Sequence, residues 1–477
     1  MGIKKNFVYN IILTLSSYII SLIVFPYVAR TLGVEAIGRV DFSNNVITYF
    51  SLFSLMGVST VGIREIASAG DDRKKRSVIF SSILGFVLLL TAISVTLFVV
   101  SIFCFDKLYS YRNLLIIGSF SLFFTSLLIE WLYQGTEQFK YISNRTIIIR
   151  ILYAISIFIF VKGRDDIYVY YFLTVMSTCV NALINLFYSR KYVDFKLSYI
   201  HLFRYAKVIL SLGVYKILTS MYTTFNVVYL GFVTSDSQVG FYSTSTKLFH
   251  ILLGILTAFT SVMLPRMSAL LSRDKHEEFK SKINYSFDLV FMFTIPIIIL
   301  TVFFAPNIIM LLSGPGFEGA IMPMRIITPM LFITGIAQIF VVQILMPLKK
   351  DSIILLGSII GAIVGIASNI VLVKEYGAVG TALTLLLSEL SCALCAFIYV
   401  TTKEIIKFPW RKMLNYLLAS IPYVILCYIA YLIIDNYIYS LLISVILSAL
   451  YYIFLNVIII KNTLVINFIN SLKARLK

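Results

Sequence analysis

Charged residues are scarce in this sequence, and acidic residues are scarcer than basic ones. Only 13% of the 477 residues are Asp, Glu, Lys or Arg, whereas 60% are hydrophobic. A soluble protein would carry about one charged residue in four. So much apolar surface cannot be hidden from water within one chain, so the composition excludes an ordinary soluble protein and predicts a membrane protein with several spans.

Cysteine and histidine are also few, which limits metal and redox chemistry. The five cysteines all fall within apolar runs: Cys104, Cys179, Cys392, Cys395 and Cys427. Two of them have CxxC spacing, but a zinc site needs four ligands and no second pair accompanies them. We expect packing thiols, no metal and no cofactor.

Long hydrophilic segments are missing as well. No link between apolar runs is large enough for a soluble domain, and the acidic pairs Asp71-Asp72 and Asp165-Asp166 lie in short loops beside Lys or Arg. A membrane glycosyltransferase or polysaccharide polymerase would need a large external loop or a cluster of catalytic carboxylates. We therefore expect no enzyme and assign no catalytic residue.

Apolar runs of about twenty residues fill most of the chain. They are continuous rather than alternating, which favours helices over barrel strands. The sequence predicts an all-α polytopic membrane protein of about fourteen transmembrane helices, at residues 7–29, 40–63, 78–105, 113–133, 145–161, 166–189, 206–231, 239–264, 284–306, 323–346, 352–373, 378–402, 414–434 and 437–460.

The distribution of basic residues predicts the orientation. With the N-terminus inside, 29 of the 40 Lys and Arg residues fall in inner segments and 7 in outer loops. This bias follows the positive-inside rule, so both termini are expected on the cytoplasmic side of the cytoplasmic (inner) membrane. The rule also accounts for the net charge of +18 without a nucleic-acid partner, and the basic inner loops favour anionic membrane lipids.

Four basic residues remain, and they lie within predicted spans. Lys216 and Lys247 fall near the middle of the bilayer, Arg150 in the cytoplasmic third and Arg325 near the outer interface. A charge at bilayer depth is costly unless it faces protein or water, so these residues are candidates for a functional site. We expect Lys216 and Lys247 to line a polar cavity.

Polar residues recur at helical spacing beside these lysines. Small polar residues in membranes also serve as ordinary helix-packing contacts, and that alternative stays open for the uncharged stripes. The stripes are Asn10, Thr14, Ser17 and Ser21; Asp41, Asn44, Asn45 and Thr48; Lys216, Thr219, Ser220 and Thr223; and Ser243, Lys247, His250, Gly254, Thr257 and Ser261.

Acidic residues inside the spans are candidates for ion coupling or for charge pairing. They are Asp41 at the head of the second span, Asp288 in the ninth and Glu389 near the middle of the twelfth, with Glu130 at the inner end of the fourth. Burial raises a carboxyl pKa and would let such a group carry a proton. Pairing with a lysine is the alternative.

An internal repeat suggests how the spans are grouped. LGVEAIGRVDFSNN stands between the first two spans, and LGFVTSDSQVGFYSTS between the seventh and eighth, about 202 residues later. We expect two six-helix bundles, residues 1–200 and 201–405, related by a pseudo-two-fold axis along the membrane normal, with two additional helices and a basic tail in 406–477.

Two motifs resemble a known family. The segments AR-x-LG-x(4)-G at Ala29 to Gly38 and G-x-REIA at Gly62 to Ala67 are similar to the N-terminal signature of bacterial O-antigen and polysaccharide repeat-unit flippases. These form the polysaccharide transport branch of the multidrug/oligosaccharidyl-lipid/polysaccharide exporter superfamily. The resemblance implies translocation of undecaprenyl-diphosphate-linked oligosaccharide by alternating access, coupled to H+ or Na+, with a polysaccharide polymerase and a chain-length regulator as partners.

The resemblance also implies what the polar residues bind. A diphosphate and acidic sugars need cations, which Lys216, Lys247, Arg30, Arg64 and Arg150 would supply around one lumen. Arg30 and Arg64 belong to the motifs, although anchoring at the membrane interface is an equal alternative for both. A drug exporter of the same superfamily is the rival function; it would place carboxylates in the lumen, and only Asp41 and Glu389 favour it.

Overall fold

A computed structural model describes residues 3–434 and 436–456 of the chain. Secondary structure in this described part is helical throughout, as the continuous apolar runs predict. The chain forms two compact units. Of the described residues, unit 1 contains 3–243, 312–316 and 362–385, and unit 2 contains 244–311, 317–361, 386–434 and 436–456. The bundle boundaries expected at residues 200 and 405 remain a proposal.

The helices of unit 1 come mainly from the first half of the chain. They are α1 (Ile3–Leu32), α2 (Val34–Leu55), α3 (Val58–Ser68), α4 (Arg73–Cys104), α5 (Asp106–Ser110), α6 (Arg112–Ser126), α7 (Glu130–Gly135), α8 (Phe139–Phe160), α9 (Ile167–Ser189), α10 (Ala206–Ser220) and α11 (Thr224–Val233).

Unit 2 is built from later helices, and several helices have residues in both units. Those of unit 2 are α13 (His276–Phe303), α15 (Ile321–Ile327), α16 (Met330–Gln338), α19 (Trp410–Ala419), α20 (Ile421–Ile433) and α21 (Tyr437–Phe454). Those with residues in both units are α12 (Asp236–Ser272), α14 (Ala305–Ser313), α17 (Asp351–Ser368) and α18 (Lys374–Thr402).

Eleven helical segments of the described residues are long and apolar enough to cross a membrane, or twelve if the bent pair α10 and α11 forms one span. One of them, Asp351–Thr402, has 52 residues, enough for two crossings of about twenty residues each. The number fourteen remains a prediction, and the last predicted span, 437–460, ends outside the described residues. Large apolar side chains such as Ile19, Ile151 and Ile363 are exposed on these helices, as expected for surfaces that face lipid.

Several spans predicted as continuous helices are broken. The span at 40–63 divides at Met56 and Gly57 into α2 and α3, and the span at 113–133 divides at 127–129 into α6 and α7. The span at 206–231 bends by 49° between α10 and α11. Apolar composition does not reveal such breaks, because the residues at each break are as apolar as their neighbours.

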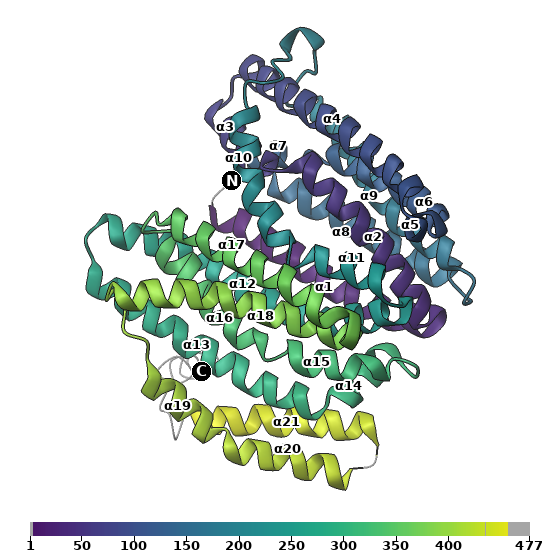
Figure 1. Cartoon of the computed structure of the whole chain (residues 1–477). Helices are drawn as coiled ribbons and strands as arrows, with labels where there is room; N and C mark the ends of the chain where they lie inside the picture. Colours follow the sequence, from purple (N-terminus) through teal and green to yellow (C-terminus); the bar gives the residue numbers. More distant parts are fainter. Residues whose placement is uncertain (1–2, 435, 457–477) are drawn as a thin grey trace, which may run out of the picture. The chain divides into compact units, whose positions relative to one another are not determined.

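Unit 1 packs around a core of aromatic and branched side chains. Phe80, Trp131, Leu132 and Tyr133 are buried there between α3, α4 and α7. Helix α1 packs against α8, and α6 packs against both α2 and α9 (Figure 1). Asp72 begins α4 as its N-cap, where its side chain accepts a hydrogen bond from the backbone N–H of Lys75 at 2.9 Å.

Unit 2 is organised around α13. Phe287 and Phe291 of this helix are fully buried, and each packs against Phe408 ahead of α19. Helices α19, α20 and α21 pack against α13, and α20 packs against α21, so the final pair is attached along one long helix (Figure 1). The basic tail predicted after α21 lies outside the described residues.

The helix junctions follow the spacing of the internal repeat. Helices α1 and α2 meet at Gly33, whose φ of 81° favours glycine. Helices α11 and α12 meet at Thr234 and Ser235, about 202 residues later. Another left-handed glycine, Gly377 with φ 52°, breaks the 52-residue segment, and a Cβ there would lie 2.4 Å from the side-chain oxygen of Gln238.

Candidate functional site

Lys216 lies next to the bend in its span. It is half-buried on α10, one turn before this helix ends at Ser220, and α11 continues at an angle of 49°. The two helices are connected by Met221, Tyr222 and Thr223. At this break, some backbone N–H and C=O groups have no hydrogen-bond partner within a helix. Broken helices near the middle of a membrane protein are where transporters bind polar substrates and ions. The structure thus places the predicted lysine beside a feature typical of substrate sites.

A second broken helix packs against α10. The backbone N–H of Gly57, between α2 and α3, donates to the carbonyl of Ile209 on α10 at 3.1 Å. Gly213 permits the close approach, because a Cβ at this position would lie 2.6 Å from Cβ of Met56. Two interrupted helices of unit 1 therefore meet near Lys216.

Lys247 belongs to unit 2 and is half-buried on α12. Its predicted polar stripe lies in one helix, with His250, Thr257 and Ser261 exposed. Gln338 at the end of α16 connects to this helix, donating to Thr257 Oγ1 at 3.0 Å and accepting from Thr260 Oγ1 at 3.0 Å. The stripe is therefore held in place by a polar contact with α16.

Arg150 ties two helices together. Its Nη1 donates to the carbonyl of Leu13 at 2.9 Å and to Oγ of Ser16 at 3.0 Å, both on α1. These contacts provide acceptors for part of the half-buried guanidinium, so they offset the cost of placing its charge within a predicted span. Ser16 was not in the predicted stripe of α1; Thr14, Ser17 and Ser21 are half-buried, and the side chain of Asn10 lies outside the described set.

The two motif arginines have different surroundings. Arg30, in the last turn of α1, lies under the loop that contains Gly314, where a Cβ would be 3.0 Å from Cγ of Arg30. Arg64, on α3, is 60% exposed and pairs with its neighbour Glu65 at 2.9 Å. Arg30 lies in the last turn of α1, whereas Arg64 lies within α3 just before its last turn, and both positions fit interfacial anchoring as well as a binding role.

The predicted acidic residues also differ in their partners. Asp288 on α13 accepts from Nζ of Lys412 on α19 at 2.8 Å, so it forms the charge pair that was one of its two predicted roles. Asp41 is half-buried in α2, and its carbonyl accepts from the side chain of Asn45 at 2.8 Å. Glu389 is half-buried on α18, and no described residue forms an ion pair with it. Arg325, on α15, donates to the carbonyl of Val302 at 3.0 Å.

Unit 1 contains a buried polar centre that the sequence did not predict. The sequence places Arg145 at an inner loop, but it lies inside α8 with 5% of its side chain exposed. Its guanidinium donates to Glu130 Oε1 at 2.9 Å and to the side-chain oxygen of Asn185, whose amide in turn donates to the carbonyl of Leu128 at the α6–α7 break. Tyr133 donates its hydroxyl to the carbonyl of Asn185. Because α8 begins six residues earlier than predicted, this arginine is a core residue.

Two π-helical segments also carry buried amides. Asn369, which begins one such segment (Asn369–Val373), donates to Oδ1 of Asn226 on α11 at 2.7 Å within unit 1. Gln343, inside the other (Ile339–Leu345), accepts from Ser286 Oγ at 2.7 Å within unit 2. π-Helical turns within longer helices are frequent at functional sites. No sequence signal pointed to them, since both segments read as plain apolar runs.

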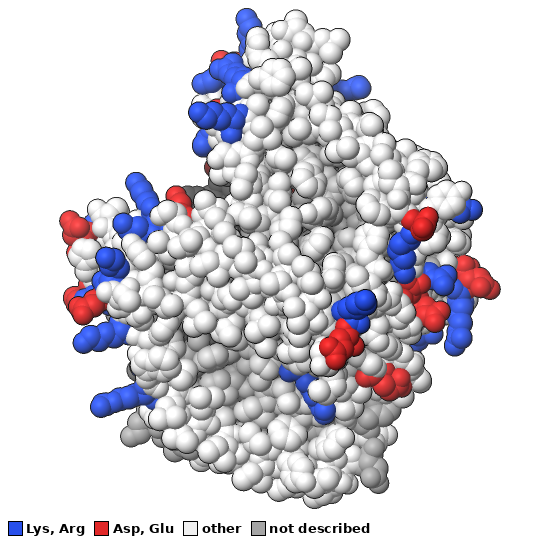
Figure 2. Space-filling view, in the orientation of Figure 1, with Lys and Arg blue, Asp and Glu red and all other residues white. Residues whose placement is uncertain are grey.

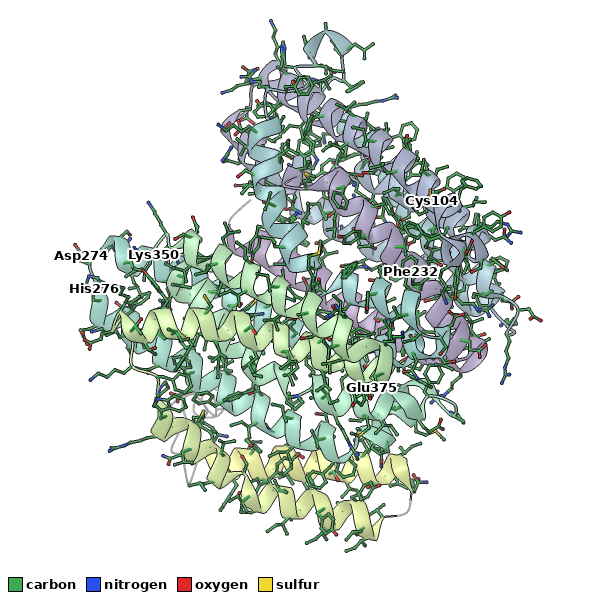
Figure 3. The ribbon with its side chains drawn as sticks, in the orientation of Figure 1. Cys104, Phe232, Asp274, His276, Lys350 and Glu375 are labelled. Atoms are coloured by element: carbon green, nitrogen blue, oxygen red, sulfur yellow. The ribbon has the colours of Figure 1, made fainter. Side chains whose placement is uncertain are left out.

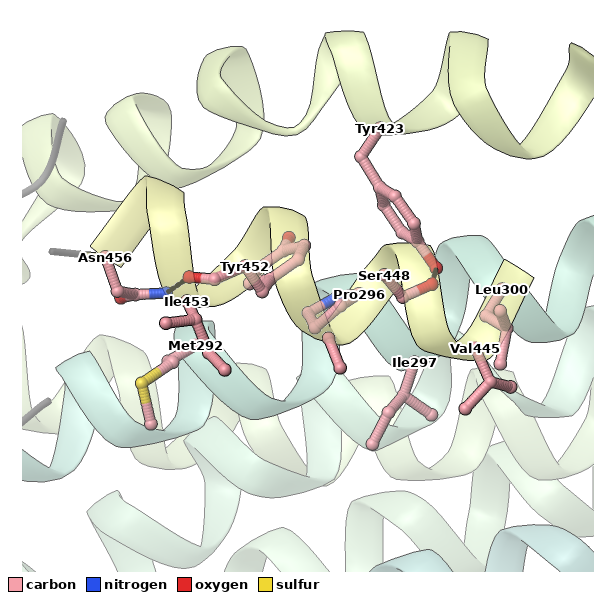
Figure 4. A pocket seen from close by; sticks show the side chains of 11 residues that line it. Met292, Pro296, Ile297, Leu300, Tyr423, Val445, Ser448, Tyr452, Ile453 and Asn456 are labelled. Carbon is pink, nitrogen blue, oxygen red and sulfur yellow. Dashed lines mark hydrogen bonds between the residues drawn. The ribbon is translucent and has the colours of Figure 1, made fainter. Parts of the chain in front are cut away.

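Unit 2 contains an apolar cavity of about 400 Å³ between α13, α20 and α21. Met292, Pro296 and Leu300 line one side, and Tyr452 and Ile453 the other (Figure 4). The Tyr423 hydroxyl meets Ser448 Oγ at 2.5 Å across the helix pair. With no charged residue in its lining, the cavity is chemically suited to hydrocarbon rather than to a diphosphate.

Other charged side chains gather at the ends of the helices. In unit 2, Asp274, His276 and Lys350 lie together at one end (Figure 3), and blue and red atoms gather at the same end in Figure 2. In unit 1, Arg73 at the start of α4 binds Asp194 through two hydrogen bonds, of 2.8 and 3.2 Å. Among the residues that the structure describes, no group of three or more His, Cys, Asp or Glu residues could hold a metal ion.

Comparison with known proteins identifies the group to which this chain is related. A family described as "Polysaccharide biosynthesis protein" matches residues 3–271, which include both motifs. A protein of Escherichia coli (strain K12) named "Putative O-antigen transporter" is 26% identical over 416 residues, covering 82% of this chain and 94% of the relative.

Solved structures share the fold. The structure described as "Lipid II flippase MurJ, inward closed conformation" superposes with a TM-score of 0.78 at 17% identity, covering 94% of this chain and 98% of the other. An inward-facing multidrug resistance transporter of the MATE family gives a TM-score of 0.59 at 15% identity, covering 82% of this chain and 94% of the transporter. The resemblance inferred from Ala29–Gly38 and Gly62–Ala67 is confirmed: this chain is a multi-pass membrane protein that belongs to the polysaccharide biosynthesis protein family.

Proposed function

We propose that this protein is a flippase that moves undecaprenyl-diphosphate-linked oligosaccharide repeat units across the cytoplasmic membrane. The observation that carries the proposal is the position of Lys216, a half-buried cation one turn before the 49° break between α10 and α11. The names given to the E. coli relative and to the MurJ flippase support a saccharide or lipid-linked saccharide as cargo.

Cations at bilayer depth suit the head of such a lipid. A diphosphate is strongly anionic, and charge-assisted hydrogen bonds to Lys or Arg offset the cost of removing it from water. Lys216 in unit 1 and Lys247 in unit 2 are the two deep lysines we assign to this task, with Arg30, Arg64 and Arg150 as additional contacts. The hydroxyl groups of the α12 stripe would bind sugar hydroxyls.

The lipid tail needs an apolar path beside the polar one. The cavity between α13, α20 and α21 is lined by apolar side chains and tyrosine rings, so it offers hydrocarbon a place next to the bilayer. We propose that this final helix pair accompanies the polyprenyl chain while the head group moves.

Transport would proceed by alternating access driven by H+ or Na+. Glu389 is the candidate for ion coupling, because it is half-buried within a predicted span and no described residue pairs with it. Asp41 is a second candidate, whereas the pair with Lys412 favours a structural role for Asp288. Helix breaks at Met56, Gly57 and residues 221–223 are natural points of bending.

The test is substitution of the two lysines in a strain that lacks this protein. We expect Lys216→Ala together with Lys247→Ala to abolish surface polysaccharide and to leave lipid-linked repeat units on the inner leaflet. Lys207→Ala is the matched control, because Lys207 lies on the same helix α10 but is exposed near its start. Normal polysaccharide in the double variant, at equal protein level, would refute the assignment.

A multidrug exporter is the alternative, and the shared fold with the MATE transporter is the observation in its favour. Cationic drugs require carboxylates in the binding cavity, so this function predicts that Asp41→Asn or Glu389→Gln raises drug sensitivity while polysaccharide stays normal. The deep lysines argue against it, because they would repel a cationic substrate.

A further inference from the structure

A polar cavity lies in unit 1, with a lining separate from the residues assigned above. It has a volume of about 300 Å³ and lies where α2, α6, α9 and α12 begin. We call it the Asp236 pocket; its main lining residues are Arg39, Lys107, Tyr111, Asn113, Tyr168 and Asp236. All of them belong to unit 1, and the predicted topology opens the pocket to the outer face of the membrane. Figure 2 shows acidic and basic atoms together at this end, near α5 and α6.

Asp236 is held by donors from three places in the chain. Arg39 Nε donates to Oδ2 at 2.9 Å, the hydroxyl of Tyr111 donates to Oδ1, and Nζ of Lys107 lies 3.6 Å from Oδ1. Burial and the hydrogen bond to Asp236 raise the pKa of the Tyr111 hydroxyl, which keeps it a donor at neutral pH. Only 17% of the aspartate side chain is exposed, so it is fixed within the wall of the pocket.

The pocket has more positive than negative charge. Arg39 and Lys107 face one carboxylate, so the lining has a net charge of +1. Among the described residues, the guanidinium of Arg39 makes its only hydrogen bond through Nε, and none bonds the side chain of Asn113. The cavity is therefore lined by guanidinium, ammonium and amide groups that have donors beyond the contacts with Asp236. A purely structural ion pair would leave neither the extra cation nor the space.

Aromatic side chains complete the lining. Tyr168 is 47% exposed on the first turn of α9, and Ile167 beside it adds an apolar surface. The loop before α9 is fixed, because the carboxylate of Asp166 accepts from the backbone N–H groups of Lys162 at 2.7 Å and Gly163 at 2.8 Å. These bonds lower the pKa of Asp166, so the loop stays anchored at neutral pH. An exposed ring on a fixed turn offers a flat surface for the C–H face of a sugar.

We propose that the Asp236 pocket binds a sugar ring that carries an anionic group, with Lys107 and Arg39 at the anion and Tyr168 against the ring. This deepens the proposed function and rests on it, since it makes the pocket a subsite for an acidic sugar of the saccharide on the outer side. The pocket is small, so it takes one ring rather than a whole repeat unit.

Direct binding to the purified full chain in lipid nanodiscs tests the proposal. The probes are methyl β-D-glucuronide, the neutral methyl β-D-glucoside and inorganic sulfate. Saturation-transfer NMR detects binding of the two sugars, and competition in a calorimeter measures the affinities. We expect the glucuronide to bind and the glucoside to bind at least about tenfold more weakly, because it lacks the charge-assisted contact. Lys107→Ala should weaken glucuronide and sulfate about equally, whereas Tyr168→Ala should weaken glucuronide alone.

Matched variants separate binding from folding. Arg164→Ala removes a cation from the loop before α9 that does not line the pocket, and it should leave binding unchanged. Asp236→Asn raises the net charge of the lining to +2 and should tighten sulfate binding, the opposite of what a mere loss of structure would do. Lys107→Arg keeps the charge and should retain sulfate binding, which identifies any loss in Lys107→Ala as a charge effect.

Two outcomes would overturn the inference. Equal affinities in Lys107→Ala, Arg164→Ala and the unmodified protein would exclude the pocket as the anion site. Sulfate binding as tight as glucuronide binding, with no effect of Tyr168→Ala, would make it a plain anion site and not a sugar site. Neither readout depends on transport, so both differ from a failure of the Lys216 and Lys247 experiment.

Discussion

The guanidinium of Arg145 on α8 donates to the carboxylate of Glu130 on α7 at 2.9 Å. The two residues are fifteen positions apart, and the turn between α7 and α8 separates them. The arginine is 5% exposed and the glutamate 38%, so the pair reaches from the core of unit 1 toward its surface. Asn185 of α9 completes it by accepting from the same guanidinium. Three helices thus depend on one side chain.

Removal of this arginine should therefore destabilise the protein. We expect Arg145→Ala to lower the free energy of unfolding by about 3 kcal/mol, because it removes one partner of a buried pair and leaves the side-chain oxygen of Asn185 with Tyr141 as its remaining donor. The measurement is thermal unfolding in detergent, followed by size-exclusion chromatography. The exposed pair of Arg64 and Glu65 is the control: Arg64→Ala should cost less than about 1 kcal/mol. Equal losses in both variants would contradict the central role of Arg145.

The contact between Arg73 and Asp194 should make stability depend on pH at acidic values. Its hydrogen bonds to Arg73 lower the pKa of Asp194 in the folded protein. The unfolded state therefore binds the proton more readily, so the contribution is complete above the ordinary aspartate pKa of about 4 and is lost as the pH falls through the lower folded value.

The test compares melting temperatures of the unmodified protein and Asp194→Asn at pH 7 and at pH 3. The variant should melt lower at pH 7 by a small amount, because the pair is exposed, and the difference should shrink at pH 3. Asp165→Asn, in another polar loop, serves as the control for lost surface charge. A difference that persists unchanged at pH 3 would show that the carboxylate charge is not involved.

Thiol labelling can test the orientation of the helices. Cys104, at the end of α4, is exposed, whereas Cys179 and Cys427 are buried. A membrane-impermeant maleimide added to intact spheroplasts should therefore label Cys104 first, and Cys104→Ser should remove most of the signal. Labelling of Cys104 only after permeabilisation would place the end of α4 on the cytoplasmic side and reverse the predicted topology.

Ion coupling can be examined in liposomes through Glu389. If a proton is the coupled ion, a gradient of one pH unit supplies a tenfold driving force for each proton, so accumulation by the unmodified protein should rise by about that factor. Glu389→Gln cannot release a proton and should make transport independent of the gradient. Asp288→Asn is the control, because Asp288 pairs with Lys412 and should leave the gradient dependence intact. If Glu389→Gln still responds to the pH gradient, the coupling site is Asp41 rather than Glu389. If the unmodified protein responds only to a Na+ gradient, the coupled ion is Na+ rather than H+.

Sequence reasoning was most successful where a property accumulates over many residues. Twenty apolar residues in a row specify a membrane helix almost regardless of their order, so the all-helical membrane fold was correctly predicted. The motifs around Arg30 and Arg64 identified the family, because each combines several residue types at fixed spacing. Side-chain partners were harder: Asp288 could be assigned to pairing only when α19 was seen to bring Lys412 to it.

Composition and short motifs are thus enough to show that this chain folds in a lipid bilayer and to identify its family. The positions where helices break, as at Gly57 and beyond Ser220, and the distant residues that meet depend on how the helices pack. Asp236 illustrates the difference, since its partners Arg39, Lys107 and Tyr111 stand more than a hundred residues before it. Hydropathy depends on each residue alone and can be read along the chain, whereas a hydrogen bond depends on two side chains whose approach is set by the packing of every helix between them.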